Sequence, residues 1–531
     1  MTLQPFTVLP DEFNAATYFI DRHRVEGRGQ KVAIECGDLR VTYQQLFERV
    51  NRVGNCLRKL GVRMEERVSL LLLDTPDFAA SFFGAIKIGA VPVPMNTLLK
   101  PTDYMYLLND SRARIAVVSE SLLPLVKAIP RQSLQFLETI LVVGSEGWPG
   151  VLNFEDELSE CSATLDAAPT SKDDAAFWLY SSGSTGRPKA CVHLQHDMLV
   201  SSEAYAKGIL NIKESDRCFS VSKLFFAYGL GNGLYFPLSV GATSILLPGP
   251  PRPDTVFDVI ERFRPTLFFS VPSNYARLLA QPRQGDRDFD LASIRWGISA
   301  GEALPAVIFH RFHERFGVQI LDAIGSTEAL HMVIANGPGH VRPGSSGKVI
   351  PGFEARIVDD DNRELPTGET GNLLVKADSV CAYYWNQHQK TKDTIEGHWI
   401  RTGDKYYQDD DGYFWYAGRT DDMLKVGGMW ISPIEIENIL LEHVAVREAA
   451  VVARPDEQQL PRTVACVVLN PDFDPTAALA IELQAFVSGR LGILKRLHQV
   501  EFHSELPKTA TGKLQRFRLR TLTDASITKE P

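Results

Sequence analysis

The stretch that decides the fold is Ala176–Lys189, which reads AFWLYSSGSTGRPK. Its first five residues are apolar or aromatic, as in a buried β-strand. The Ser/Thr/Gly loop that follows offers backbone N–H groups and hydroxyls in a concave array, which a polyphosphate needs. It does not match the pattern G-x-x-x-x-G-K-[ST], so a P-loop ATPase or GTPase is disfavoured. We expect phosphate contacts from Ser181, Ser182, Gly183, Ser184, Thr185, Gly186 and Lys189.

Around this stretch the chain repeats one pattern, a short β-branched or aromatic run followed by a turn and a helical period. Examples are Arg67–Leu73 before Asp77–Ile88, Thr266–Val271 before Asn274–Ala280, and Ile294–Ser299 before Ala306–Phe316. This alternation predicts an α/β domain of mostly parallel sheets with helices. Residues 347–375 contain short strands and turns without helices, which predicts a small β-rich subdomain.

A different pattern starts near residue 420. A capped helix is expected at Ser432–Glu442, strands at Glu448–Arg454 and Thr463–Asn470, and a further helix at Ile481–Leu491. These elements suffice for a separate α+β domain. We therefore divide the chain into an N-terminal domain, residues 1–420, and a mobile C-terminal domain, residues 421–531.

Composition narrows the classes of function. The 531 residues are 44% hydrophobic and 23% charged, which excludes a disordered or fibrous protein. The formal charge of -9 argues against nucleic acid as a partner. No export signal or transmembrane run is visible, so no membrane partner is expected. The seven dispersed cysteines contain no CxxC pair, which favours reduced thiols and a cytoplasmic location.

Four further motifs follow the phosphate loop in order. They are DAIGSTE at Asp322–Glu328, RTGD at Arg401–Asp404, GRTDDMLK at Gly418–Lys425 and PKTATGK at Pro507–Lys513. With the loop, they make the chain resemble the adenylate-forming superfamily of acyl-CoA synthetases, peptide-synthetase adenylation domains and luciferases. This resemblance implies a two-step reaction that uses ATP and Mg²⁺ to form an acyl-AMP and then transfers the acyl group.

The resemblance also implies residue roles. Glu328 would bind Mg²⁺, which typically takes one or two protein carboxylates. Lys513 would be the mobile catalytic lysine, stabilising charge in the adenylation transition state, and it is an expected target of a lysine acetyltransferase. Arg516, Arg518 and Arg520 are expected to be solvated. The remaining expected ATP contacts are Asp322, Thr327, Asp404 and Arg419, with Asp404 at the end of a strand, where its carboxylate would accept both ribose hydroxyls.

The acyl substrate is inferred from the tract Leu224–Gly229. Amino-acid-activating relatives usually carry an aspartate at about Ala227, so an amino acid is disfavoured. The tract is most similar to that of benzoate-type CoA ligases, which implies an aromatic acid, with benzoate preferred. A hydroxybenzoate or another small carboxylic acid is the alternative. The expected pocket residues are Phe226, Ala227, Tyr228, Ala300, Gly301, Ile324, His331 and Ile334.

The acyl acceptor is inferred from Gly427 and Gly428, which would let the pantetheine arm of coenzyme A pass beside the backbone. Asp421 occupies the hinge position, where rotation would exchange the Lys513 loop for the glycine pair. Loading of a separate carrier protein, oxygenation as in luciferases, and a regulatory nucleotide-binding protein without catalysis are the alternatives. A homodimer is a further expectation.

Overall fold

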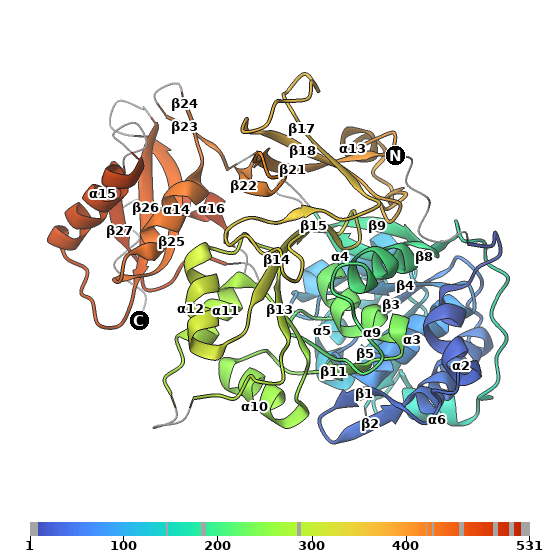
Figure 1. The fold of residues 1–531 in the computed structure, drawn as a ribbon. Coiled ribbons are helices and arrows are strands. Elements are labelled where there is room, and N and C mark those ends of the chain that lie inside the picture. The colour runs from blue at the N-terminus through green and yellow to red at the C-terminus, as the bar shows by residue number, and fades with distance from the viewer. Residues whose placement is uncertain are drawn as a thin grey trace.

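The computed structural model describes residues 9–144, 147–181, 187–283, 288–420, 422–426, 429–455, 461–491, 497–508 and 514–521. Figure 1 shows the C-terminal elements gathered at one side of a larger α/β body. The phosphate-loop residues 182–186, Asp421, Gly427, Gly428 and Lys513 lie outside the described residues. The structure therefore describes only the residues that precede and follow these positions in the chain.

The largest sheet has nine strands, and its central strands are parallel. Its order is β16 (Lys348–Val349), β15 (Met332–Ala335), β14 (Ile320–Gly325), β13 (Trp296–Ser299), β12 (Leu267–Ser270), β10 (Arg217–Ser220), β11 (Thr243–Leu246), β1 (Val32–Cys36) and β2 (Leu39–Thr42). The strands from β1 to β14 pair in parallel, whereas β2, β15 and β16 are antiparallel additions at the edges. The predicted strand–helix alternation is confirmed here.

A second core forms on one side of this sheet. Phe219 and Phe268, from β10 and β12, pack in one cluster with Tyr275 and Phe312. The helices that contribute side chains to this cluster are α10 (Pro253–Phe263), α11 (Pro272–Leu279) and α12 (Ala306–Phe316). Strands buried on both faces have near-continuous apolar sequences, as LFFS in β12 shows.

A five-stranded parallel sheet forms from the first part of the chain. Its order is β4 (Val91–Pro94), β3 (Arg67–Leu71), β5 (Ile115–Ser119), β6 (Thr139–Val143) and β7 (Leu152–Asn153). The helix α2 (Tyr43–Lys59) packs on α3 (Pro76–Lys87). It begins at a capping box, in which Thr42 and Gln45 satisfy each other's backbone N–H groups.

The phosphate loop joins two antiparallel strands, β8 (Ala175–Ser181) and β9 (Lys189–Leu194), and β19 (Tyr383–Tyr384) pairs with the far edge of β9. The sequence pattern had not predicted β9. After β9 the chain forms α7 (Asp197–Ser201), which continues as the π-helix η4 (Ser202–Lys207). The loop thus closes a hairpin.

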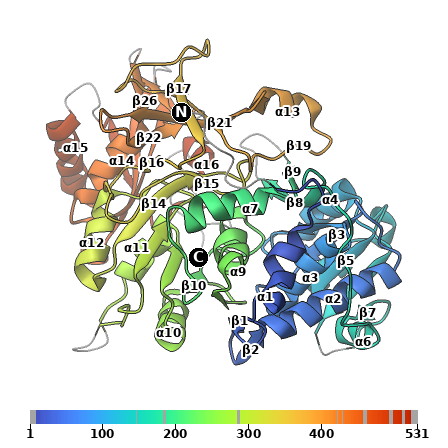
Figure 2. The same cartoon turned by 45° about the vertical axis from the view of Figure 1, so that its right-hand side comes forward.

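The predicted β-rich subdomain is an antiparallel sheet (Figure 2). Its strands are β17 (Glu354–Val358), β18 (Gly371–Lys376), β20 (Ile395–Glu396), β21 (Trp399–Gln408) and β22 (Phe414–Arg419). We had expected Asp404 at the end of a strand, and this was wrong, because Asp404 lies inside β21. The neighbouring Gly403 has φ +76°, and the register with β22 shifts after Lys405. This irregularity in the backbone allows the turn-like sequence Thr402-Gly403-Asp404 to lie within a strand.

The C-terminal part is the predicted α+β unit. Its three-stranded sheet has the order β25 (Val446–Pro455), β26 (Pro461–Leu469) and β27 (Gln499–Phe502). A hairpin of β23 (Leu424–Val426) and β24 (Met429–Ile431) precedes α14 (Pro433–Glu442), and α15 (Ala477–Leu491) and α16 (Arg516–Thr521) complete the unit. Ser432 caps α14, as the sequence predicts. The domain boundary at 420/421 stays a prediction.

The structure also contains several shorter helices. They are η1 (Thr17–Asp21), α1 (Arg22–Val25), α4 (Pro101–Ser111), η2 (Glu120–Leu122), α5 (Leu123–Lys127), η3 (Arg131–Ser133), α6 (Phe154–Ser159), α8 (Ala227–Leu230), η5 (Gly231–Tyr235), α9 (Phe236–Val240) and α13 (His388–Thr394). All seven cysteines are buried and unpaired, as expected for reduced thiols.

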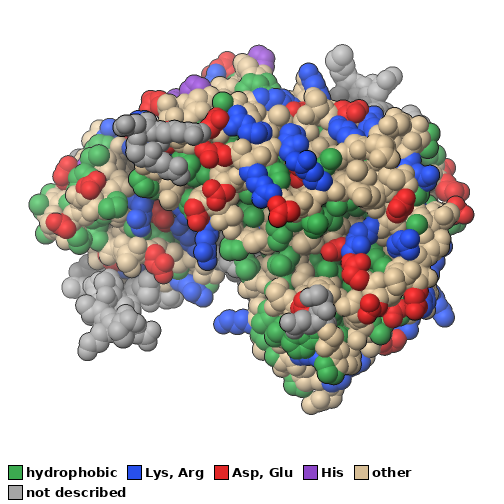
Figure 3. Space-filling model, turned by 90° about the horizontal axis from the view of Figure 1, so that it is seen from below, with side chains coloured by type: hydrophobic (Ala, Val, Ile, Leu, Met, Phe, Trp, Pro, Cys, Tyr) green, Lys and Arg blue, Asp and Glu red, His purple; other side chains and the backbone are tan. Residues whose placement is uncertain are grey.

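The surface agrees with the charge balance of the sequence. Figure 3 shows Lys and Arg side chains interspersed with Asp and Glu on the face seen from below. Among the described residues, no helix combines the length and apolar character needed to cross a bilayer.

The expectation that Arg516 and Arg520 are solvated was wrong. The Arg516 guanidinium, 12% exposed, donates to both carboxylate oxygens of Glu437, at 2.8 and 2.7 Å. Arg520 donates to Asp422 at 2.6 Å. These ion pairs hold a helix of only six residues against α14 and Asp422, which composition alone does not reveal.

Candidate active site

The site forms around Glu328, where three donors meet at one carboxylate oxygen. Oε1 accepts from the Tyr384 hydroxyl at 2.7 Å, from Ser181 Oγ at 3.1 Å and from Lys189 Nζ at 3.3 Å. Ser181 and Lys189 flank the phosphate loop on β8 and β9, and Tyr384 lies on β19. The antiparallel pairing of these strands therefore brings the two residues that flank the loop beside the Glu328 carboxylate.

The electrostatics keep Glu328 ionised. Burial alone would raise its pKa, but the Lys189 charge and the Tyr384 hydrogen bond outweigh burial and lower the pKa below its usual value. Burial and the nearby Glu328 charge raise the pKa of Tyr384 well above its ordinary value, so its hydroxyl stays a donor. Lys189 also donates to the Tyr384 hydroxyl at 2.8 Å and lies 4.1 Å from its ring centroid. The result is an anionic oxygen ligand beside a cation.

The turn that carries Thr327 and Glu328 is held by a buried imidazole. His193 Nε2 lies 2.9 Å from the Thr327 carbonyl oxygen, and Nδ1 lies 2.8 Å from Asp197 Oδ2. The Cys381 N–H donates to the Glu328 carbonyl at 2.7 Å. Thr327 therefore takes part in this site through its backbone carbonyl oxygen.

Asp404 and Arg419 are cross-strand partners in β21 and β22. Arg419 donates to Asp404 Oδ1 at 3.0 Å and to the Thr402 carbonyl at 3.1 Å. A carboxylate is an acceptor with two oxygens, so the pair suits a ligand that presents hydroxyl groups, and the guanidinium suits an anion.

Asp322, at the start of the same motif as Glu328, is fully packed. Its side chain is 4% exposed, and burial raises its pKa to about 8. Its Oδ1 has no hydrogen-bond partner among the described residues. A buried polar atom without a partner is costly, which makes Asp322 a candidate for contact with a polar ligand.

The predicted acyl pocket contains a buried imidazole among aromatic rings. His331 is 2% exposed, and its ring centroid lies 5.7 Å from that of Tyr228 and 4.4 Å from that of Phe236. Neither ring nitrogen of His331 has a hydrogen-bond partner among the described residues. Burial lowers its pKa to about 3, so the imidazole is neutral near pH 7. The Tyr228 hydroxyl donates toward the carbonyls of Ser270 and Ile298, at 3.1 and 3.2 Å, which fixes the ring.

The other predicted pocket residues lie on neighbouring elements. Phe226 precedes α8 with its ring centroid 4.3 Å from that of Phe225, and Ala227 begins the helix, buried. Ile324 and Ile334 are cross-strand partners in β14 and β15.

Ala300 and Gly301 follow the end of β13. Ala300 is buried, whereas Gly301 is exposed and has φ +89°. An added Cβ at Gly301 would meet only Val271 Cγ1, at 3.9 Å. This positive φ is a backbone conformation that favours glycine.

Sequence reasoning named Tyr228 beside His331 but missed Tyr384, His193 and the other aromatic partners of His331, which are Tyr205, Tyr235 and Phe236. Tyr384 follows Glu328 by 56 residues and belongs to no motif, so only the pairing of β19 with β9 reveals it. His193 and Asp197 are four residues apart, a spacing that surface helices show often. Gly231 lies against His331 and belongs to none of the motifs identified from the sequence.

Comparison with known proteins agrees with this geometry. The AMP-binding enzyme family matches residues 21–385, and the AMP-binding enzyme C-terminal domain matches residues 435–513. The chain is 46% identical to benzoate–CoA ligase of Thauera aromatica over 526 residues, which cover 97% of each protein. It is 42% identical to 4-hydroxybenzoate–CoA/benzoate–CoA ligase of Rhodopseudomonas palustris, with 97% of this chain and 95% of that protein covered.

A solved structure shows the same arrangement. The crystal structures of a benzoate CoA ligase from Burkholderia xenovorans LB400 superpose with a TM-score of 0.88 at 44% identity, covering 96% of this chain and 100% of that one. The α/β fold with a separate C-terminal unit is thereby confirmed. Two family models in the expected order, near-full-length identity and the shared fold lead to one conclusion: this chain belongs to the AMP-binding enzyme family.

Proposed function

We propose that the protein is an AMP-forming aromatic acid–CoA ligase that converts benzoate, ATP and CoA into benzoyl-CoA, AMP and pyrophosphate. The relatives reported above carry out, by their names, the ligation of benzoate or hydroxybenzoate to CoA. ATP and CoA are substrates of this ligase family. We extend their reaction to this chain and assign roles to its residues.

The observation that carries the proposal is the Tyr228–His331 pair. A flat, neutral and buried aromatic wall suits a planar ring, and a well-placed aromatic pair contributes about 0.5–1.5 kcal/mol beyond area burial. Ala227 presents no charge that would bind an ammonium group. A benzoate ring fits this chemistry better than an amino acid does.

Adenylation is the first step. A carboxylate oxygen of the acid attacks the α-phosphorus of ATP, and pyrophosphate leaves. We assign Lys189 to the phosphates, Asp404 to the ribose hydroxyls and Lys513 to the charge that develops between carboxylate and phosphate. The unpartnered Oδ1 of Asp322 supports a contact with the nucleotide. Arg419, which holds Asp404, completes this set.

The residues around Glu328 fit a magnesium ion. An ionised carboxylate and the Ser181 hydroxyl are oxygen donors, and Mg²⁺ prefers one or two protein carboxylates with phosphate oxygens and water. Glu328 would hold the ion, which when bound would neutralise negative charge on the phosphates. Tyr384 and Lys189 orient the carboxylate for this task.

Thioester formation is the second step. The CoA thiolate attacks the acyl carbon of benzoyl-AMP, and AMP leaves. We assign Gly427 and Gly428 to the path of the pantetheine arm and Asp421 to the pivot that exchanges them with the Lys513 loop. A cytoplasmic location, a homodimer and acetylation of Lys513 as an off switch belong to the same proposal.

One observation favours a second substrate class. His331 has two buried ring nitrogens without partners, and the buried Tyr205 hydroxyl, whose ring centroid lies 5.5 Å from that of His331, also lacks one. A hydroxyl substituent on the substrate ring would satisfy such groups. A hydroxybenzoate is therefore the second candidate.

The test is a substrate panel with purified protein. Benzoate, the three hydroxybenzoates, cyclohexanecarboxylate and a medium-chain fatty acid are each supplied with ATP, Mg²⁺ and CoA, and AMP and acyl-CoA are measured. The highest kcat/KM for benzoate supports the proposal, and a preference for a hydroxybenzoate supports the second candidate. A fatty-acid preference, or acyl-AMP without thioester, contradicts both.

A further inference from the structure

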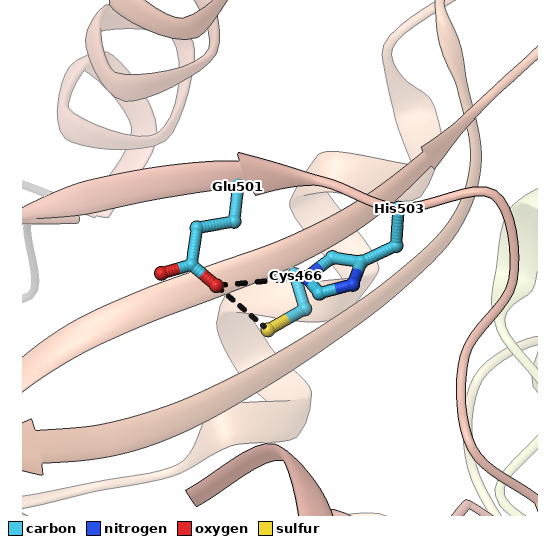
Figure 4. A group of neighbouring side chains, drawn as sticks. All are labelled: Cys466, Glu501 and His503. Atoms are coloured by element: carbon cyan, nitrogen blue, oxygen red, sulfur yellow. Dashed lines mark hydrogen bonds and ion pairs between the residues drawn. The ribbon is translucent and has the colours of Figure 1, made fainter. Parts of the chain in front are cut away.

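Three side chains of the types that commonly bind metals lie close together in the C-terminal sheet, away from the site described above (Figure 4). Cys466 on β26 and Glu501 on β27 are cross-strand partners, and His503 follows β27 on the same side as Glu501. Glu501 Oε2 lies 3.9 Å from Cys466 Sγ and 3.5 Å from His503 Nε2. One ligand atom from each residue lies within 4.8 Å of the others.

The three ligand residues are largely buried, and the protein satisfies them unequally, because Cys466 Sγ donates to Glu501 Oε2 at 3.9 Å and accepts from Arg454 at 3.7 Å. Cys466 is 0% exposed and Glu501 is 7% exposed. Glu501 Oε1 accepts from Arg454 at 2.6 Å and from Gln499 at 3.0 Å, so Oε2 is the oxygen left facing Cys466 and His503. His503 Nε2 is buried without a hydrogen-bond partner among the described residues. Such an atom commonly marks a missing ligand.

We propose that Cys466 Sγ, Glu501 Oε2 and His503 Nε2 bind a divalent transition-metal ion of the Zn²⁺ class. Usual zinc bond lengths in a tetrahedron require sulfur–oxygen and nitrogen–oxygen separations of about 3.6 and 3.4 Å. The corresponding separations here are 3.9 and 3.5 Å, and a His503 ring nitrogen lies within 4.8 Å of Cys466 Sγ, where a tetrahedron requires about 3.6 Å. A thiolate, a carboxylate and an imidazole are all common zinc ligands.

Charge and proton balance are consistent with such an ion. Metal binding requires the Cys466 thiolate, so it releases one proton from the thiol to the solvent. The thiolate and the Glu501 carboxylate then face the dication and Arg454. Arg454 acts as an outer partner that fixes the orientation of the carboxylate, as is usual around zinc ligands.

The location gives the ion a structural effect. Cys466 packs in one cluster with Leu506 and Leu519 of the segment that follows the sheet. Arg454 Nε donates to the Leu519 carbonyl at 2.8 Å. The ion would therefore stabilise the sheet against which α16 packs. It would also stabilise the two ends of the Lys513 loop, where the Gln515 N–H donates to the Pro507 carbonyl.

The experiment is a Co²⁺ titration of the reduced, chelator-treated full chain, followed by near-ultraviolet absorption. We expect one Co²⁺ per chain with a sulfur-to-cobalt charge-transfer band that added Zn²⁺ removes. Cys466→Ser should abolish the band, and His503→Gln should weaken Co²⁺ binding at least about tenfold. The matched control is Cys218→Ser, another fully buried strand cysteine, which should keep the band.

A second readout is thermal unfolding. Zn²⁺ should raise the Tm of the wild type and of Cys218→Ser, but not that of His503→Gln. A band that persists in Cys466→Ser, or no band with Co²⁺ in excess, overturns the proposal. Because these readouts require no turnover, their failure is separate from failure of the proposed ligase activity.

Discussion

The Tyr384 hydroxyl donates a 2.7 Å hydrogen bond to Oε1 of Glu328, 56 residues earlier in the chain. The same hydroxyl accepts from Lys189, so one phenol links the carboxylate to the edge of the phosphate loop. Since β19 is only two residues long, its pairing with β9 serves mainly to bring Tyr384 to this position. The first prediction follows from this contact.

Tyr384→Phe should slow adenylation. A hydrogen bond to a charged group contributes about 1.5–3 kcal/mol, so kcat/KM for ATP should fall by about 10- to 100-fold. Because the Tyr384 hydrogen bond lowers the pKa of Glu328, its loss raises that pKa, and the acidic limb of the rate profile should move to higher pH. Pyrophosphate release measured across pH checks both effects. Tyr383→Phe, on the same strand but 42% exposed, is the control and should change neither.

Gly231→Ala should damage the acyl pocket. An added Cβ would lie 2.5 Å from His331 Cδ2 and 2.9 Å from the Tyr235 hydroxyl, so the imidazole must shift. Overpacking costs about 1–3 kcal/mol, so we expect KM for benzoate to rise by about 5- to 150-fold while KM for ATP changes little. Gly233→Ala is the control, because its Cβ would meet Leu224 Cδ2 at 3.1 Å and no pocket residue. Equal effects of the two variants would contradict the placement of the acid beside His331.

Lys513→Ala should separate the two half-reactions. Each 1.36 kcal/mol of lost transition-state stabilisation costs about tenfold in rate, so adenylation should fall by orders of magnitude. Thioester formation from supplied benzoyl-AMP and CoA should survive better. The control is Lys508→Ala, in the same segment, where the ammonium pairs with Glu448 at 2.6 Å. Equal loss of both half-reactions would refute the assigned role of Lys513.

Asp421→Pro should impair thioester formation more than adenylation. Proline fixes φ near −65°, and a hinge must change its backbone torsions between the two steps. Asp421→Ala keeps the torsions free and should be mild. Pyrophosphate release and thioester formation, the latter from supplied acyl-AMP, are measured separately. If Asp421→Pro leaves thioester formation intact, the pivot lies at another residue or no rotation is needed.

The sequence by itself determined the class of fold and the order of the motifs. Strand–helix alternation is a local property, so segments such as Ala306–Phe316 were predicted with the bounds that the structure gives α12. Glu328 and Lys189 were likewise identified from short motifs, because their neighbours along the chain define them.

Only the tertiary structure decided which distant residues meet. Tyr384, His331 with its aromatic partners, and the ion pairs of Arg516 depend on strand pairing and helix packing between segments far apart in sequence. The same holds for Cys466, which becomes a candidate ligand only because parallel pairing of β26 and β27 sets it beside Glu501. Such contacts produce no periodic pattern in the sequence, because a packed side chain must fit its spatial neighbours and not its neighbours along the chain.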